Sequence, residues 1–91
     1  MNRAERENHR RKTVVRWVWS ELQRKKVVTL TEIETKFRMY CEGIMKEAVT
    51  YGLFSATNTG DDIGWYLSVL TADDNATQFS EKLEIYYKTH Q

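Results

Sequence analysis

The sequence predicts an α+β domain in which one helix, a short strand and two further helices precede a two-stranded hairpin and a final helix. Helical spacing of apolar residues ends at Gly52, where the end of a helix favours a left-handed residue. Apolar runs at residues 53–57 and 65–70 flank a segment rich in Gly, Asn and Asp, which reverses the chain. A third run, residues 27–30, is short and β-branched, as suits a single brief strand.

The first helix is expected to begin between Arg3 and Thr13 and to end near Lys25. One broad arc of it is apolar at 3.6-residue spacing and is expected to form the core face. That arc consists of Val14, Val15, Val18, Trp19 and Leu22. Trp17 lies beside the arc and is either an exposed contact residue or an indole that closes the edge of the core. Residues 1–12 are interpreted as a basic arm or a frayed first turn.

The second helix has a start signal in two overlapping registers. Thr29 with Glu32, or Thr31 with Glu34, has the spacing in which a hydroxyl caps the third amide and the carboxylate reaches back. A helix is expected to begin here in either register.

The end of the second helix leaves two interpretations. Either residues 32–51 form one continuous helix, or a turn at residues 38–40 separates two short helices. We favour the turn, because two short helices bury Ile33 and Phe37 together with Ile44 and Ala48 better than one straight rod does.

A final helix from about Ala72 to Lys88 is predicted by the capping-box spacing of Thr71 and Asp74 and by the apolar stripe that follows. The stripe packs either across the first helix or against the same helix of a second copy. We favour a homodimer, because Ile85 lies off the main stripe and would be exposed in a monomer. The residues assigned to the dimer contact are Phe79, Leu83, Ile85, Tyr86 and Tyr87.

Composition is that of an ordinary folded protein, with 41% hydrophobic and 30% charged residues. No apolar run is long enough to cross a bilayer, and the N-terminus leads into charge rather than into an apolar signal sequence. We therefore expect an intracellular protein, cytoplasmic or nucleoid-associated, with no membrane partner. The single Cys41 is expected to be a small buried residue. Because no Gly-rich phosphate loop, paired nucleophile or metal-ligand cluster occurs, we expect no enzyme activity, cofactor or metal.

Charge is divided unevenly along the chain. Residues 1–26 carry nine basic and three acidic side chains, whereas the other 65 residues carry five basic and ten acidic ones. Such a division indicates two surfaces with different partners, of which only the first is suited to phosphate. The alternative is a solvated helix face whose charges serve solubility alone.

The order of these elements, with the step Tyr51-Gly52-Leu53 between helix and hairpin, resembles the winged-helix family. The resemblance implies a winged-helix domain at residues 13–70, with a C-terminal helix at residues 71–91 as an added element. It also implies that the third helix enters the major groove of duplex DNA while the hairpin, or wing, lies along the backbone or in the minor groove.

A small DNA-binding transcription regulator is the first function that this resemblance favours. The first helix would supply most of the positive charge, and the third helix and wing would make groove contacts. The assigned residues are Arg10, Arg11, Lys12, Arg16, Arg24, Lys25, Lys26, Arg38, Tyr40, Lys46, Thr50 and Asn58. On a helical projection Lys46 is the only basic residue on the outward side of the third helix.

The alternative is a winged helix that docks onto a protein, such as a viral or plasmid inhibitor of a host protein. Adjacent carboxylates at the wing tip oppose phosphate binding, because they repel the DNA backbone. The residues assigned to this docking surface are Glu42, Glu47, Asp61, Asp62 and Trp17. The sequence leaves the two functions open, and salt-dependent binding to duplex DNA distinguishes them.

Overall fold

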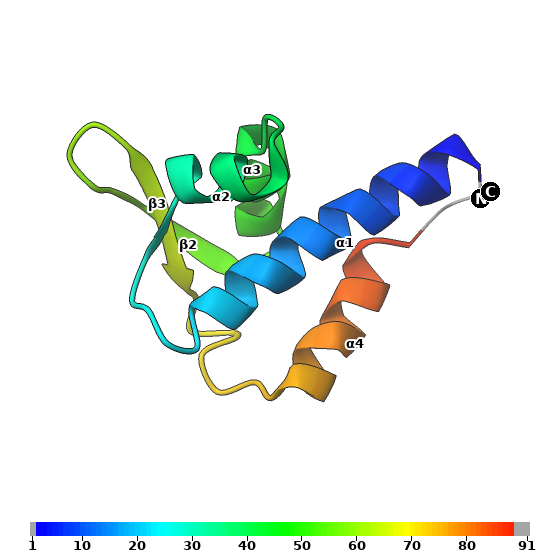
Figure 1. Ribbon diagram of the computed structural model, residues 1–91. Helices are drawn as coiled ribbons and strands as arrows, with labels where there is room; N and C mark the ends of the chain where they lie inside the picture. The colour runs from blue at the N-terminus through cyan, green and yellow to red at the C-terminus, as the bar shows by residue number, and fades with distance from the viewer. Residues whose placement is uncertain (1, 89–91) are drawn as a thin grey trace.

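The computed structural model describes residues 2–88 of the chain. Within them the fold is α+β, with four helices and a three-stranded antiparallel sheet (Figure 1). The elements are α1 Arg3–Glu21, β1 Val28–Thr29, α2 Leu30–Phe37, α3 Glu42–Thr50, β2 Phe54–Asn58, β3 Ile63–Leu67 and α4 Ala76–Tyr86. None of these helices combines the length and apolar character needed to traverse a bilayer.

The sheet has the order β1-β3-β2 and contains the predicted hairpin. Phe54 pairs with Leu67 at the base of the hairpin and Asn58 pairs with Ile63 near its tip. The β1 strand adds to the other edge of β3, where Thr29 faces Gly64. A Cβ at Gly64 would lie 2.6 Å from a methyl group of Val27, so only glycine fits this close approach.

The first helix begins at Arg3, because the side chain of Asn2 caps it by accepting a hydrogen bond from the backbone N–H of Glu5. Residues 3–12 are therefore the first turns of α1 rather than a separate basic arm. The helix ends at Glu21, about one turn before the predicted end at Lys25.

The predicted turn between the second and third helices is confirmed. Arg38 ends α2 in the left-handed region, with φ of 54° and ψ of 42°, so the helix cannot continue. The Glu34 carboxylate accepts a hydrogen bond of 2.8 Å from the backbone N–H of Cys41, which fixes the entry into α3. At the start of α2, Thr29 and Glu32 form the capping box, so the register with Thr31 and Glu34 is wrong.

The last helix begins later than predicted. Asn75 and Gln78 form its capping box, whereas Thr71 and Asp74 do not cap it. The Thr71 hydroxyl donates a 2.8 Å hydrogen bond to the carbonyl of Leu53 instead. Asp74 accepts a hydrogen bond from Lys82. The helix therefore starts at Ala76, and residues 89–91 of the predicted C-terminal segment lie outside the residues described.

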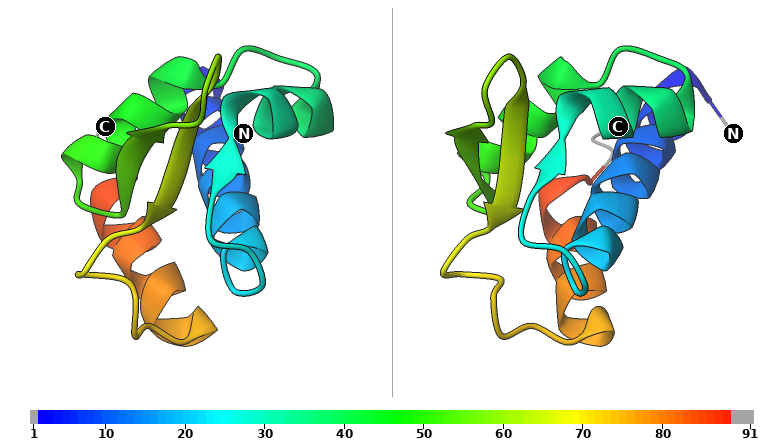
Figure 2. Two further views of the ribbon diagram at one scale, coloured as in Figure 1. Left: turned by 90° about the vertical axis from the view of Figure 1, so that its left-hand side faces the viewer. Right: turned by 60° about the vertical axis from the view of Figure 1, so that its left-hand side comes forward.

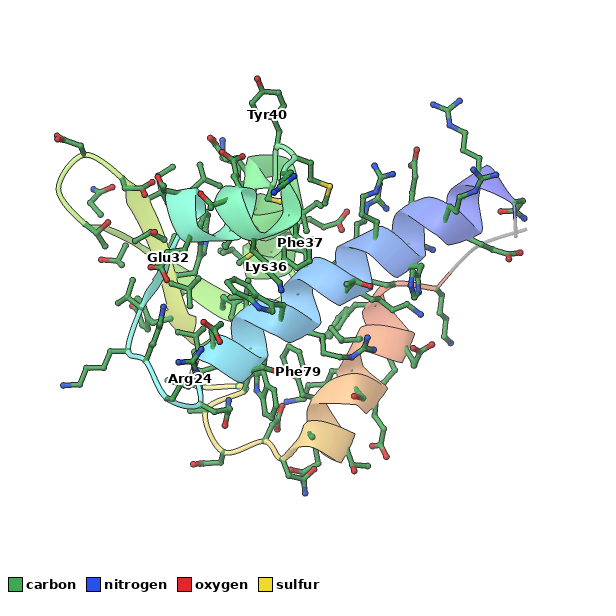
Figure 3. All side chains as sticks on the ribbon, viewed as in Figure 1. Arg24, Glu32, Lys36, Phe37, Tyr40 and Phe79 are labelled. Carbon is green, nitrogen blue, oxygen red and sulfur yellow. The ribbon has the colours of Figure 1, made fainter. Side chains whose placement is uncertain are left out.

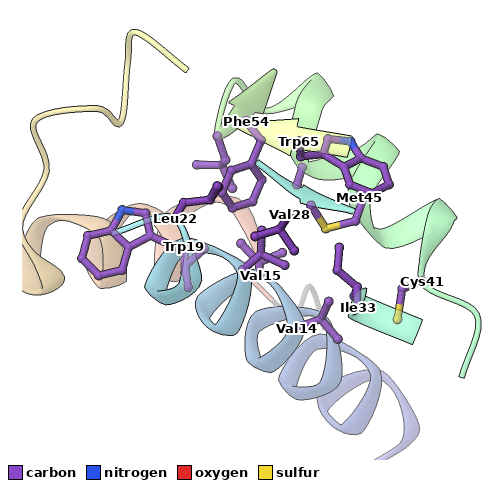
Figure 4. Packing of buried hydrophobic residues seen from close by; sticks show 14 of the residues in the cluster. Val14, Val15, Trp19, Leu22, Val28, Ile33, Cys41, Met45, Phe54 and Trp65 are labelled. Carbon is purple, nitrogen blue, oxygen red and sulfur yellow. The ribbon is translucent and has the colours of Figure 1, made fainter. Parts of the chain in front are cut away.

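The core lies along α1, from Trp19 and Leu22 beside Phe54 to Val14 beside Ile33 (Figure 4). The final helix runs beside α1 and closes this core (Figures 1 and 2). Phe79 stacks on Trp19 with ring centroids 5.0 Å apart.

This packing corrects the predicted dimer contact. Phe79, Leu83 and Tyr87 are buried in the monomer, with at most 4% of each residue exposed, so they are not available to a second copy. Of the assigned dimer residues, Ile85 and Tyr86 lie on the surface. The apolar stripe of α4 thus follows the other interpretation and completes the core of the monomer.

Candidate nucleic-acid interface

The third helix and the hairpin enclose an open cleft of about 380 Å³. The cleft forms between one face of the β2–β3 hairpin and the side of α3 that is nearest to it. The cleft is lined by Lys46, Val49, Ala56, Thr57, Asn58, Ile63 and Trp65. Its walls are mostly apolar, and Lys46 supplies the only ionisable side chain among them.

The outer side of α3 exposes Gly43, Lys46 and Thr50, and the outward position of Lys46 is as the helical projection predicts. The Lys46 ammonium lies 2.8 Å from the Glu42 carboxylate one turn earlier. The Thr50 hydroxyl donates a hydrogen bond back to the carbonyl of Lys46. The single cation on this side of α3 is therefore paired with a carboxylate of its own helix.

Glu47 does not lie on that outer side. It is half-buried and faces α1, where its Oε1 is 4.0 Å from Nε of Arg11. Among the residues described, neither Oε1 of Glu47 nor the buried hydroxyl of Tyr87 has a hydrogen-bond partner. Burial, followed by the nearby carboxylate of Glu47, raises the pKa of Tyr87 above its ordinary value. Glu47 is thus part of the α1–α3–α4 junction, and its role in docking stays a prediction.

The two aspartates at the tip of the β2–β3 hairpin differ in role. Asp61 is exposed, whereas Asp62 is half-buried and binds backbone N–H groups. One Asp62 oxygen accepts from Thr31 at the start of α2, and the other accepts from Ile63 at 2.8 Å. Hydrogen bonds from the Thr31 hydroxyl and from these amides hold the pKa of Asp62 below its ordinary value. Asp62 therefore ties the hairpin to α2, and of the two aspartates Asp61 alone is exposed.

Basic residues of the first 26 positions fall into two groups. The first group is paired with carboxylates: Arg3 with Glu7, Arg11 with Glu7 and Glu47, Lys12 with Glu84, Arg24 with Glu21, and Lys25 with Glu21 and Glu32. The second group, Arg10, Arg16 and Lys26, is exposed and has no carboxylate partner among residues 2–88. Arg6, which the sequence prediction does not include, belongs with them.

The remaining assigned residues lie at the ends of elements, except Trp17, which lies within α1. Arg38 and Tyr40 are exposed in the α2–α3 turn, where 94% of Tyr40 is accessible and its ring points away from the fold (Figure 3). Asn58 is exposed at the end of β2. Trp17 is half-buried, with its ring 5.6 Å from that of Phe37 in an edge-to-face contact. Trp17 therefore closes the edge of the core, the second of its two predicted roles, and its place in a docking surface stays a prediction.

One exposed apolar patch is missing from the sequence prediction. Residues 65–70 are predicted as one strand, but β3 ends at Leu67, where the Ser68 hydroxyl donates to the carbonyl of Gly52 at 2.6 Å. The chain then turns outward and leaves Val69 93% and Leu70 65% exposed. Leu70 and Tyr86 line a shared hollow of about 210 Å³ with Tyr51. A run of apolar residues does not show where a strand stops, so no local signal identifies this patch.

Comparisons with known proteins identify no relative. No protein-family model matches the chain, and searches of curated proteins and of solved structures find no match. Within residues 2–88, no group of three or more His, Cys, Asp or Glu side chains is arranged to hold a metal ion.

Proposed function

We propose that this chain is a small DNA-binding protein of the winged-helix type that acts in transcription regulation. The element order α1-β1-α2-α3-β2-β3 and the sheet order β1-β3-β2 support a winged-helix layout. In that layout α3 is the helix that enters a groove, and the β2–β3 hairpin is the wing. Such a protein regulates by occupying its site, which requires no catalytic group.

The observation that carries the proposal is the uncovered side of α3. Gly43, Lys46 and Thr50 are exposed along one side of the helix, and the hairpin stands beside them across the cleft. Gly43 has no neighbouring atom within 4 Å of where a Cβ would stand, so a DNA backbone can approach it closely. Lys46 and Thr50 are suited to donate hydrogen bonds to base edges or phosphates.

Fluorescence anisotropy with a labelled duplex of mixed sequence tests this proposal. We expect binding that weakens steeply between about 50 and 200 mM salt, as release of counterions requires. A competition with genomic fragments then selects the preferred sequence. If no duplex binds at the lowest salt concentration, the proposal is wrong.

The second candidate function is protein docking, which the exposed Val69, Leu70 and Tyr86 favour. The partner is either a host protein or a second copy, in which case the homodimer forms through this patch and Ile85. Sedimentation velocity over a range of concentrations tests the homodimer. We expect Val69→Asp to abolish it and Tyr40→Asp, at an equally exposed apolar position, to leave it intact. A monomer at every concentration would remove the homodimer.

A further inference from the structure

Three neighbours fix which side of α1 faces outward. The α2 helix contacts α1 through Trp17 and Phe37, α3 contacts it through Arg11 and Glu47, and α4 contacts it through Lys12 and Glu84. Successive residues of an α-helix are 100° apart, so these contacts occupy three flanks of α1. The outer arc lies between the α2 flank and the α4 flank, on the side away from α3.

That outer arc is strongly basic. Arg6, Thr13 and Arg16 lie within it, and Arg10, one turn after Arg6, lies at its edge on the flank of Trp17, two turns before that residue. All four are exposed, and the three arginines have no carboxylate partner within residues 2–88. From Arg6 to Arg16 the helix rises about 15 Å, a length over which one strand of B-DNA presents several phosphates. We call Arg6, Arg10 and Arg16 the outer arginines.

The side of the fold that includes α3 and the wing lacks such charge. Lys46 is paired with Glu42, and Asp61 stands exposed at the wing tip. Because this side carries little net positive charge, it attracts a polyanion weakly. A duplex that contacted only α3 and the wing would show few released counterions.

We propose that the outer arginines of α1 form the surface that binds the DNA phosphate backbone, and that most of the salt dependence of binding arises there and not at α3 or the wing. This proposal rests on the proposed DNA binding. It assigns to α1 phosphate contacts, which carry no sequence information, and leaves base reading to α3, which faces the other way and therefore meets a different segment of the duplex. The occupant is duplex DNA, because a straight helix with three unpaired arginines suits a regular phosphate array.

The test compares two triple variants that remove the same charge from the same region. Arg6→Gln/Arg10→Gln/Arg16→Gln removes the outer arginines, and Arg11→Gln/Lys12→Gln/Lys25→Gln removes three paired cations. Glutamine keeps helix propensity close to that of arginine and lysine, and circular dichroism verifies that both variants fold. The slope of log K against log salt concentration is then measured for the wild type and for both variants.

We expect the first variant to lose up to about 2.7 units of slope, since each phosphate contact contributes about 0.9. The second variant is expected to change the slope by less than about 0.9, which is the contribution of one phosphate contact. If both variants bind duplex DNA and lose the same slope, only net charge matters and the outer arginines are not a binding surface. That result would leave the proposed DNA binding intact, whereas a wild type that binds no duplex would overturn both proposals. Single-stranded DNA that binds as tightly as the duplex, with the same loss in the first variant, would overturn the duplex as the occupant.

Discussion

Replacing Phe79 with alanine tests whether α4 belongs to the core of the monomer. Phe79 is 1% exposed, and its ring stacks on Trp19 at 5.0 Å and lies 6.1 Å from Phe54. The Phe79→Ala variant therefore loses a fully buried ring and leaves a cavity between α1, β2 and α4. A buried phenylalanine changed to alanine costs about 3–5 kcal/mol, because lost transfer energy and the cavity add together.

This cost is large for a chain of this size. At roughly 0.05–0.15 kcal/mol per residue, 91 residues have a free energy of unfolding of about 5–14 kcal/mol. Urea unfolding followed by circular dichroism measures the change. With a slope of about 1–3 kcal/mol per molar urea, the midpoint is expected to fall by at least about 1 M.

Ile85→Ala is the matched control, because it shortens an apolar residue of the same helix that is 62% exposed. We expect this control to change the free energy of unfolding by less than about 0.5 kcal/mol. The reasoning is refuted if the two variants have equal midpoints. That result would mean that α4 is not packed against α1. Phe79, Leu83 and Tyr87 would then be available for the predicted dimer contact.

Three further predictions concern single residues. Gly43→Ala is expected to stabilise the protein by about 0.5–1 kcal/mol, because alanine favours a helix more than glycine does. Gly52→Ala is expected to cost about 1–2 kcal/mol, because φ of 79° at this position disfavours a side chain. Equal changes in the urea midpoint of the two variants would contradict both expectations. The folded pKa of Asp62 is depressed, so its stabilising contribution is present above the unfolded value near 3.9 and is lost as pH falls through the folded value. Between about pH 5 and 2, the free energy of unfolding should therefore fall less for Asp62→Asn than for the wild type. Parallel plots of this free energy against pH for the two proteins would argue against the hydrogen bond from Thr31 of α2 to Asp62. Burial raises the pKa of the Cys41 thiol, so a thiol reagent should label it only after urea unfolds the chain, and fast labelling of the native protein would contradict this.

Elements whose signals are local could be predicted from the sequence. Gly52 adopts the left-handed conformation at the end of α3, with φ of 79°, and the hairpin follows it as the turn residues predict. The turn after α2 is an instructive case, because its left-handed residue is Arg38 and not a glycine. Propensity alone therefore does not show this break, whereas the better burial of Ile33 by two short helices than by one straight rod does.

The start of α4 could not be predicted in the same way. Thr71 with Asp74 and Asn75 with Gln78 both have capping spacing, and the choice depends on a partner distant in sequence. Thr71 is fully buried and donates to the carbonyl of Leu53, 18 residues earlier, so it cannot cap a helix. Tertiary hydrogen bonding thus overrides a local signal that is equally good at both positions.

The candidate interface depended even more on distant partners. The sequence shows nine basic residues before position 27, but pairing with carboxylates up to 72 residues away decides which of them remain available. Lys12 is neutralised by Glu84, and Lys25 by Glu32. Asp62, which resembles a repulsive wing charge in the sequence, binds the amide that begins α2.

Ion pairing therefore changes which surface the positive charge of the N-terminal region favours. The paired cations, such as Arg11 and Lys12, lie on the flanks of α1 that face α3 and α4, because carboxylates of those helices meet them there. The outer arginines have no helix opposite them, so no carboxylate neutralises them. Packing α3 and α4 against α1 thus concentrates unpaired charge on the side away from the proposed groove-reading helix. A duplex that is read by α3 and also contacts the outer arginines must bend around the domain or bind two copies of it. The slopes of log K against log salt concentration for the two triple variants distinguish such binding from contact at α3 alone.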